Sequence, residues 1–257
     1  MVELKTPSEI EEMARGGAII GALFGELEAR VAPGVSTLEL DAFAEEFIRS
    51  TEGATPVFKG LYGFPGSLCT SINEEIVHGI PSSERVLQEG DIISIDVGVR
   101  LSGWCSDSAR TFPVGESAPE IARLLEVTRD ALERAIEATV PGNHIGNIGH
   151  AVEQAVDGTG FAIIRDLVGH GVGRKVHEDP QVPNRGEPGT GPELRPGMVL
   201  AIEPMISTGS HRIRTLADRW TMVTTDGSPS AHFEHTVALT PEGPRVLTGA
   251  PSAVESR

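Results

Sequence analysis

The chain has 257 residues, two cysteines and a formal net charge of −16. This acidic balance disfavours nucleic-acid binding, which depends on clustered Lys and Arg, and no apolar run is long enough to span a membrane. The N-terminus lacks the basic and apolar segments of a secretory signal, and two isolated cysteines form no disulfide framework. We therefore expect a cytoplasmic protein with one domain, residues 1–257. The acidic surplus is explained by solvated surface groups, or in part by carboxylates gathered around cations.

The first half of the chain begins with two amphipathic patterns. They predict a helix over residues 8–31 and, after a Pro33-Gly34 turn, a second helix that begins near Ser36. Ser36 and Glu39 have the spacing of a capping box. Two apolar runs, residues 92–98 and 104–112, flank a polar turn at residues 100–103 and predict an antiparallel hairpin.

The second half repeats this order. A helix is predicted over residues 117–139, with Ser117 and Glu120 as a capping box, and a Pro141-Gly142 turn leads into another helix. Pro33 and Pro141 lie 108 residues apart, and apolar positions keep that offset. We expect two similar halves, about residues 5–113 and 114–247, around a pseudo-two-fold axis, with residues 248–257 as a disordered tail. Chance similarity of amphipathic helices is the alternative explanation.

Four acidic residues interrupt apolar, strand-like segments. An unpaired carboxylate in such a place is unfavourable, so it requires a cation, hydrogen bonds or a proton. One such residue can simply face solvent, but exposure of all four is improbable. Four carboxylates balance two divalent cations, and a neutral histidine adds a nitrogen ligand, a set that suits Mn, Fe, Co or Zn. The pattern predicts a two-metal hydrolytic site built from Asp96, Asp107, Glu203, Glu234 and His170.

The most informative run, residues 169–180, reads GHGVGRKVHEDP. His170 and His177 are seven residues apart, which fits one ligand and one separate catalytic group better than a histidine pair on one metal. The glycines beside His170 allow backbone to approach closely. Taken singly, His177 and His78 would be interpreted as hydrogen-bonded or surface histidines. The motifs of a zinc helix, a phosphate-binding loop and a nucleophile elbow are absent.

Together with the run SINEEIVHGIP at residues 71–81, SIDVG at 94–98, AIEPM at 201–205 and FEHT at 233–236, this segment resembles the methionine aminopeptidases, specifically the short bacterial type I form. The resemblance extends from about Lys5 to Leu247. It implies an α+β pita-bread fold, in which helix pairs pack on a curved antiparallel sheet. It also implies hydrolysis of the first peptide bond of nascent proteins and peptides, with removal of the N-terminal methionine and a preference for a small second residue.

The resemblance implies a role for each site residue. Asp96, Asp107, His170, Glu203 and Glu234 would hold two divalent ions, Co, Mn, Fe or Zn. Glu203 would also move a proton, His177 would stabilise the oxyanion, and His78 would contact the scissile amide. The methionine pocket would contain Phe58, Leu61, Tyr62, Phe64, Cys69, Val176 and Trp220. A monovalent cation would lie near Asn73, Glu75 and Ser230. The expected partners are nascent chains and, transiently, the ribosome, and we expect a monomer.

The pocket departs from the family pattern at three positions. Phe58 replaces cysteine, Leu61 replaces tyrosine and Val176 replaces phenylalanine, which affects selectivity rather than chemistry. Each pocket residue could also be ordinary core. Two other activities remain open. A proline-specific peptidase of the same fold would use a nearly identical ligand set, and a catalytically inactive binding protein would have lost ligands. Arg174 and Lys175 form either a local basic patch or a solvated loop.

Overall fold

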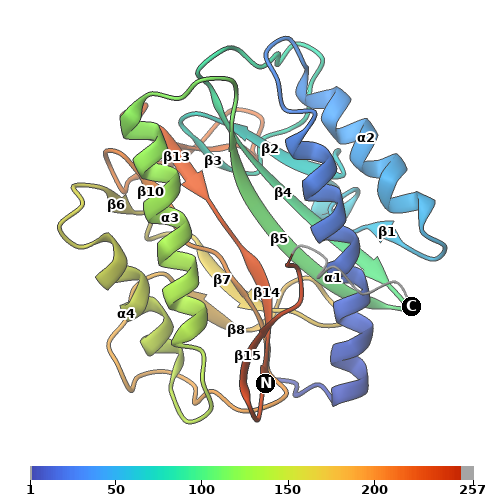
Figure 1. Cartoon of the computed structure of the whole chain (residues 1–257), viewed down its shortest axis with the longest axis vertical. Helices are drawn as coiled ribbons and strands as arrows, with labels where there is room; N and C mark the ends of the chain where they lie inside the picture. Colours follow the sequence, from blue (N-terminus) through green and yellow to red (C-terminus); the bar gives the residue numbers. More distant parts are fainter. Residues whose placement is uncertain (1, 250–257) are drawn as a thin grey trace.

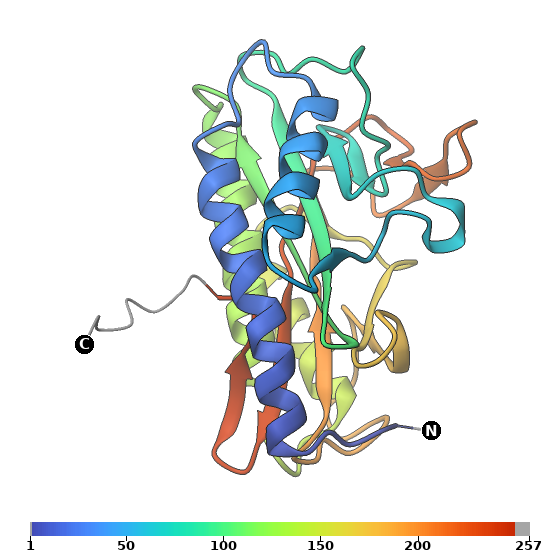
Figure 2. The same cartoon turned by 90° about the vertical axis from the view of Figure 1, so that its right-hand side faces the viewer.

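The structure, a computed structural model, describes residues 2–249. Figure 1 shows α1 and α3 in front of the strands, with α2 beside α1 and α4 beside α3. Figure 2 shows the helices mainly to one side of the strands, and the segments of residues 57–67 and 208–229 to the other. The helices are α1 (Pro7–Glu28), α2 (Thr37–Ser50), α3 (Pro119–Glu137) and α4 (Ile145–Val156), with a short 3₁₀ helix, η1 (Leu61–Gly63).

The strands form mainly antiparallel sheets, which with the helices confirm the predicted α+β class. The first half contributes β1 (Thr55–Pro56), β2 (Leu68–Ile72), β3 (Glu75–Val77), β4 (Ile92–Leu101) and β5 (Trp104–Pro113). The second contributes β6 (Ala162–Ile163), β7 (Val168–Gly171), β8 (Glu178–Pro183), β9 (Val199–Ile202), β10 (Met205–Ser207), β11 (Ile213–Thr215), β12 (Met222–Thr224), β13 (Ser230–His232), β14 (His235–Thr240) and β15 (Gly243–Val246). Strands β1, β2, β4 and β5 form one sheet, and the largest has the order β15-β14-β9-β7-β8.

The helix starts are set by their capping residues. The predicted capping box at Ser36 is confirmed, since its side chain accepts from the Glu39 amide while the Glu39 carboxylate accepts from the Ser36 amide. The capping box predicted at Ser117 is wrong. Helix α3 has Ala118 as N-cap and a proline in its first turn, so the Ser117 side chain lies one position too early to cap it. Helices α1 and α3 both end two or three residues before their predicted limits.

The predicted hairpin is confirmed as β4 and β5, and it is longer than expected. Arg100 and Leu101 pair with Cys105 and Trp104, so the turn contains only Ser102 and Gly103, both with positive φ. Asp96 pairs with Ala109, and Asp107 lies two residues from Ala109 on the same strand. Because side chains alternate along a strand, Asp96 and Asp107 lie on the same face of the hairpin.

Each half has its own apolar core. The first core joins α1 and α2 to β4, with Phe24, Ile20 and Ile95 fully buried. The second joins α3 and α4 to β9 and β14. The tail predicted over residues 248–257 starts too early, because Thr248 is buried and its hydroxyl accepts a hydrogen bond from the Thr236 amide. Residues 250–257 lie outside the described part of the chain.

Candidate metal centre

Hydrogen bonds between β5 and the start of β14 join the two halves at the centre of the molecule. The Glu234 amide donates to the Ala109 carbonyl at 2.9 Å, and the Ser108 hydroxyl donates to the Glu234 carbonyl at 2.5 Å. The Thr236 hydroxyl also donates to the carbonyl of Asp107 at 2.7 Å. These bonds fix the backbones of Asp107 and Glu234 beside each other, although the residues are 127 positions apart.

Glu203 lies at a break between strands rather than inside a strand as predicted, and Glu234 directly precedes β14, next to the strand start where it was predicted. Glu203 separates β9 from β10, and Glu234 separates β13 from β14. The Asn184 side chain donates to the Glu203 carbonyl at 3.0 Å and so holds this break in place. Both glutamate side chains are therefore free of the strand alternation and line the same cavity as Asp96 and Asp107.

His170 lies on β7, where the glycines beside it allow close backbone packing, as predicted. A Cβ on Gly169 would lie 2.3 Å from the Ala201 carbonyl oxygen, and one on Gly171 would lie 2.1 Å from that of Asp179. The Nδ1 atom of His170 is 2.9 Å from the Gly171 carbonyl. Because a carbonyl only accepts, Nδ1 carries the proton and Nε2 presents a lone pair.

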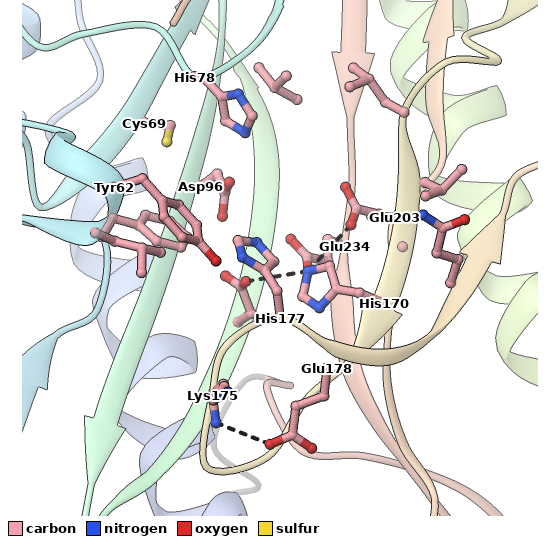
Figure 3. Close-up of a pocket in the computed structure, with 18 of the residues that line it drawn as sticks. Tyr62, Cys69, His78, Asp96, His170, Lys175, His177, Glu178, Glu203 and Glu234 are labelled. Carbon is pink, nitrogen blue, oxygen red and sulfur yellow. Dashed lines mark hydrogen bonds and ion pairs between the residues drawn. The ribbon is translucent and has the colours of Figure 1, made fainter. Parts of the chain in front are cut away.

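The Nε2 atom of His170 faces the carboxylates. It lies 3.6 Å from Glu203 Oε1 and 3.9 Å from Asp107 Oδ2. Asp107, His170 and Glu234 each offer one ligand atom, and these atoms lie within 4.8 Å of one another. Figure 3 shows His170, Glu203 and Glu234 directed toward one region, with Asp96 across the cavity. The five predicted ligands therefore line one cavity. Asp96 and Glu203 lie beside the group formed by Asp107, His170 and Glu234.

Burial and mutual repulsion oppose ionisation of these carboxylates. Burial raises the pKa of Asp96 from 3.8 to about 7 and that of Glu203 from 4.5 to about 7. The pKa values of Asp107 and Glu234 are raised well above their ordinary values, first by burial and then by the neighbouring acids. Burial lowers the pKa of His170, which keeps the imidazole neutral at pH 7. Cations are required for all four acids to be ionised near neutral pH.

Unpartnered buried atoms test whether this set fits divalent cations. Among the described residues, Asp96 Oδ1, Asp107 Oδ1 and Glu234 Oε1 are buried side-chain oxygens without a hydrogen-bond partner. Buried polar atoms are normally paired, and here the unpaired atoms surround a neutral imidazole nitrogen. Oxygen-rich sites with one imidazole suit divalent Mn, Fe, Co or Zn. The residues therefore fit divalent cations.

A cavity of about 830 Å³ opens beside the carboxylates. Its apolar wall contains six of the residues predicted for the methionine pocket, namely Phe58, Leu61, Tyr62, Phe64, Cys69 and Trp220. Phe64 meets Trp220 edge to face with ring centroids 5.1 Å apart, whereas Tyr62 is 78% exposed at the mouth. Val176 does not line the cavity. It is buried in the apolar cluster that also contains Phe58, Phe64 and Cys69, so it packs beside the pocket residues rather than lining the cavity as predicted.

His78 and His177 face the cavity without joining the ligand group. His177 packs against His170 edge to face at 4.5 Å and stacks on Tyr62 at 6.2 Å. His78 adopts φ 60°, a sparsely populated conformation, and lies edge-on to Trp220. Burial lowers the pKa of His78 to about 4 and also lowers that of His177. Both rings are therefore neutral at pH 7 and can each donate one hydrogen bond.

Sequence reasoning missed one histidine of the site. His232 is 2% exposed, lines the cavity, and has its Nε2 atom 3.6 Å from Glu203 Oε2. Its position two residues before Glu234 is the only sequence signal. At the predicted monovalent cation site, the Asn73 carbonyl accepts from the Ser230 amide at 2.9 Å, while Glu75 pairs with Arg85.

The model of metallopeptidase family M24 matches residues 11–241. Methionine aminopeptidase of Clostridium perfringens is 52% identical over 96% of this chain and 99% of its own length. The structure of methionine aminopeptidase from Thermotoga maritima superposes with a TM-score of 0.95 at 45% identity and covers 97% of this chain and 100% of that one. The Xaa-Pro dipeptidase of Bacillus anthracis shares the fold at a TM-score of 0.77 and 24% identity, and this chain covers 62% of it.

The fold and the carboxylate-rich centre are those of a metallopeptidase. Within that class, the chain belongs to the methionine aminopeptidases of family M24. Its α+β architecture is the pita-bread fold.

Proposed function

We propose that this chain hydrolyses the first peptide bond of proteins and peptides that begin with methionine, at a centre of two divalent cations held by Asp96, Asp107, His170, Glu203 and Glu234. The proposal depends mainly on the convergence of four carboxylates, of which Asp107 and Glu234 are buried and Asp96 and Glu203 half-buried, with the Nε2 atom of His170 at one end of an apolar cavity. Bound cations activate a water molecule and polarise the substrate carbonyl.

The protein side chains divide the remaining work. Glu203 accepts the proton of the attacking water and delivers it to the leaving amine, because its carboxylate lines the cavity beside His170. His177 donates to the carbonyl oxygen as negative charge develops, and His78 contacts the scissile amide. Both roles require a neutral imidazole that keeps one N–H, as burial provides.

The apolar wall receives the methionine side chain. Cys69 is buried and Phe64 and Trp220 form an aromatic edge, so the slot offers polarisable contacts to a thioether. Phe58 and Leu61 replace the residues usual in the family and make this wall more apolar. We propose that they alter inhibitor selectivity without changing the chemistry. A small second residue is preferred, as the family resemblance implies.

Further features of the proposal follow from composition and motif. The metals are Co, Mn, Fe or Zn, and a monovalent cation lies near Asn73, Glu75 and Ser230. The enzyme is a monomer with a single domain and is located in the cytoplasm. It acts on nascent polypeptides and contacts the ribosome transiently. The two buried free cysteines are consistent with a reducing compartment. No helix in the described part of the chain is long and apolar enough to cross a membrane.

The test is peptide hydrolysis by protein reconstituted with Co²⁺ or Mn²⁺. Methionyl peptides with Gly or Ala second should be cleaved faster than those with Leu or Phe second. Glu203→Gln should lose hydrolysis while the exposed Glu242→Gln control keeps it. Cleavage of Xaa-Pro peptides in preference to methionyl peptides would instead establish the proline-specific activity, and wild-type activity in Glu203→Gln would disprove the proton-transfer role.

A further inference from the structure

His232 is a buried imidazole with a polar atom that the proposed chemistry leaves unused. Its ring lies 2% exposed at the floor of the cavity, and Nε2 has no hydrogen-bond partner. A buried polar atom without a partner is destabilising, which indicates that Nε2 has a partner in the loaded enzyme.

The backbone of His232 is held rigidly. Its amide donates to the Thr111 hydroxyl at 2.8 Å, and that hydroxyl donates to the His232 carbonyl at 2.9 Å. The Ser94 hydroxyl lies 2.8 Å from the same Thr111 oxygen, so three groups hydrogen-bond to this hydroxyl. His232 also pairs with Met205, two residues beyond Glu203. These contacts fix the imidazole relative to the break in the backbone that carries Glu203.

The Glu203 carboxylate lies between two imidazoles. Its Oε1 is 3.6 Å from His170 Nε2, and its Oε2 is 3.6 Å from His232 Nε2. His170 presents a lone pair, because its Nδ1 carries the proton toward the Gly171 carbonyl. His232 Nε2 is also 4.0 Å from Glu234 Oε2, so it faces oxygen atoms of two acids. A lone pair there would repel both acids, whereas an N–H is attracted by both.

We infer that His232 is a positioning residue whose Nε2–H donates to Oε2 of ionised Glu203 and leaves Oε1 on the side of His170 Nε2. Such a bond would leave one oxygen of Glu203 available to a cation and would fix the orientation from which the carboxylate accepts the proton. The inference rests on the proposed ligand and proton-transfer roles of Glu203. Partners of metal ligands typically contribute 10- to 100-fold in metal affinity or activity.

The experiment compares His232→Leu, His232→Gln and a remote control, His150→Leu in α4. Calorimetric titration of the metal-free full chain with Co²⁺ should show affinity about 10- to 100-fold weaker for His232→Leu. The Gln variant, whose amide can donate to Oε2, should recover most of the affinity, and His150→Leu should match wild type. With methionyl peptides, the loss in His232→Leu should fall on kcat rather than KM, because His232 orients Glu203 and not the substrate.

Three results would overturn the inference. The first is wild-type Co²⁺ affinity and kcat in His232→Leu. The second is loss of one bound Co²⁺ and a changed visible absorption spectrum in both variants, which would make His232 a direct ligand. The third is a His232 ring that carries its proton on Nδ1 instead of Nε2. Its tautomer can be measured by ¹⁵N-histidine NMR of the wild-type chain, even if His232→Leu does not fold. Failure of the proposed function is distinct, because wild-type protein would then bind Co²⁺ without cleaving methionyl peptides.

Discussion

Removal of the metals should make the stability of this protein fall as pH rises above 7. In the metal-free fold, burial and mutual repulsion raise the pKa values of Asp107 and Glu234 well above their ordinary values, and those of Asp96 and Glu203 reach about 7. The folded state therefore keeps protons that the unfolded chain has released. Raised pKa values of this kind stabilise at low pH, and the contribution is lost as pH rises through the folded-state values.

The window from pH 7 to 9 isolates this effect. Burial lowers the pKa values of His78, His232 and the other buried histidines. Titration of these histidines makes stability rise with pH, but only below about pH 6.5, the pKa of histidine in the unfolded chain. Each proton retained only by the folded state changes the free energy of unfolding by about 1.4 kcal/mol per pH unit. One proton retained by Asp107 or Glu234 thus lowers stability as pH rises, by at most about 3 kcal/mol across the window, or about 6–12 °C in Tm.

The assay is urea and thermal unfolding of chelator-treated protein at pH 7, 8 and 9. Reconstitution with Mn²⁺ or Co²⁺ should remove the slope, because the cations keep the carboxylates ionised in the fold. Glu234→Gln, which removes one acid from the cluster, should flatten the slope of the metal-free protein, and the exposed Glu242→Gln should not. A metal-free protein equally or more stable at pH 9 than at pH 7 would refute the reasoning.

Four further substitutions separate chemistry from packing. Glu203→Gln should lower kcat by about 10²- to 10⁴-fold with little loss of Tm, which steady-state kinetics and calorimetry would check. His177→Ala should lower kcat/KM by about 10²- to 10³-fold if it stabilises the oxyanion, and an unchanged value would exclude that role. Gly169→Ala should lower Tm and Co²⁺ affinity, because its Cβ would lie 2.3 Å from the Ala201 carbonyl. Gly25→Ala, in open space on α1, should instead stabilise by about 1 kcal/mol.

The sequence by itself determined the local elements and the chemistry of the ligand set. Amphipathic periodicity, the Ser36 cap and the alternation of β4 and β5 depend on short-range rules, so the helices and the hairpin are predictable within a few residues. Carboxylates in apolar sequence segments indicated a metal centre, because a buried carboxylate requires a cation, hydrogen bonds or a proton. The glycines beside His170 indicated close backbone packing, which β7 and β9 confirm.

The tertiary structure alone decided which side chains share a surface. Val176 faces the core and Leu61 the cavity, although both lie among apolar residues in sequence. His232 joins Glu203 only because β13 pairs with β10, a contact between segments with no common motif. Asp107 and Glu234 meet because hydrogen bonds connect β5 to the start of β14 across 127 residues. Local rules fix the elements, but long-range pairing sets where each side chain points, and that pairing depends on the packing of the whole chain.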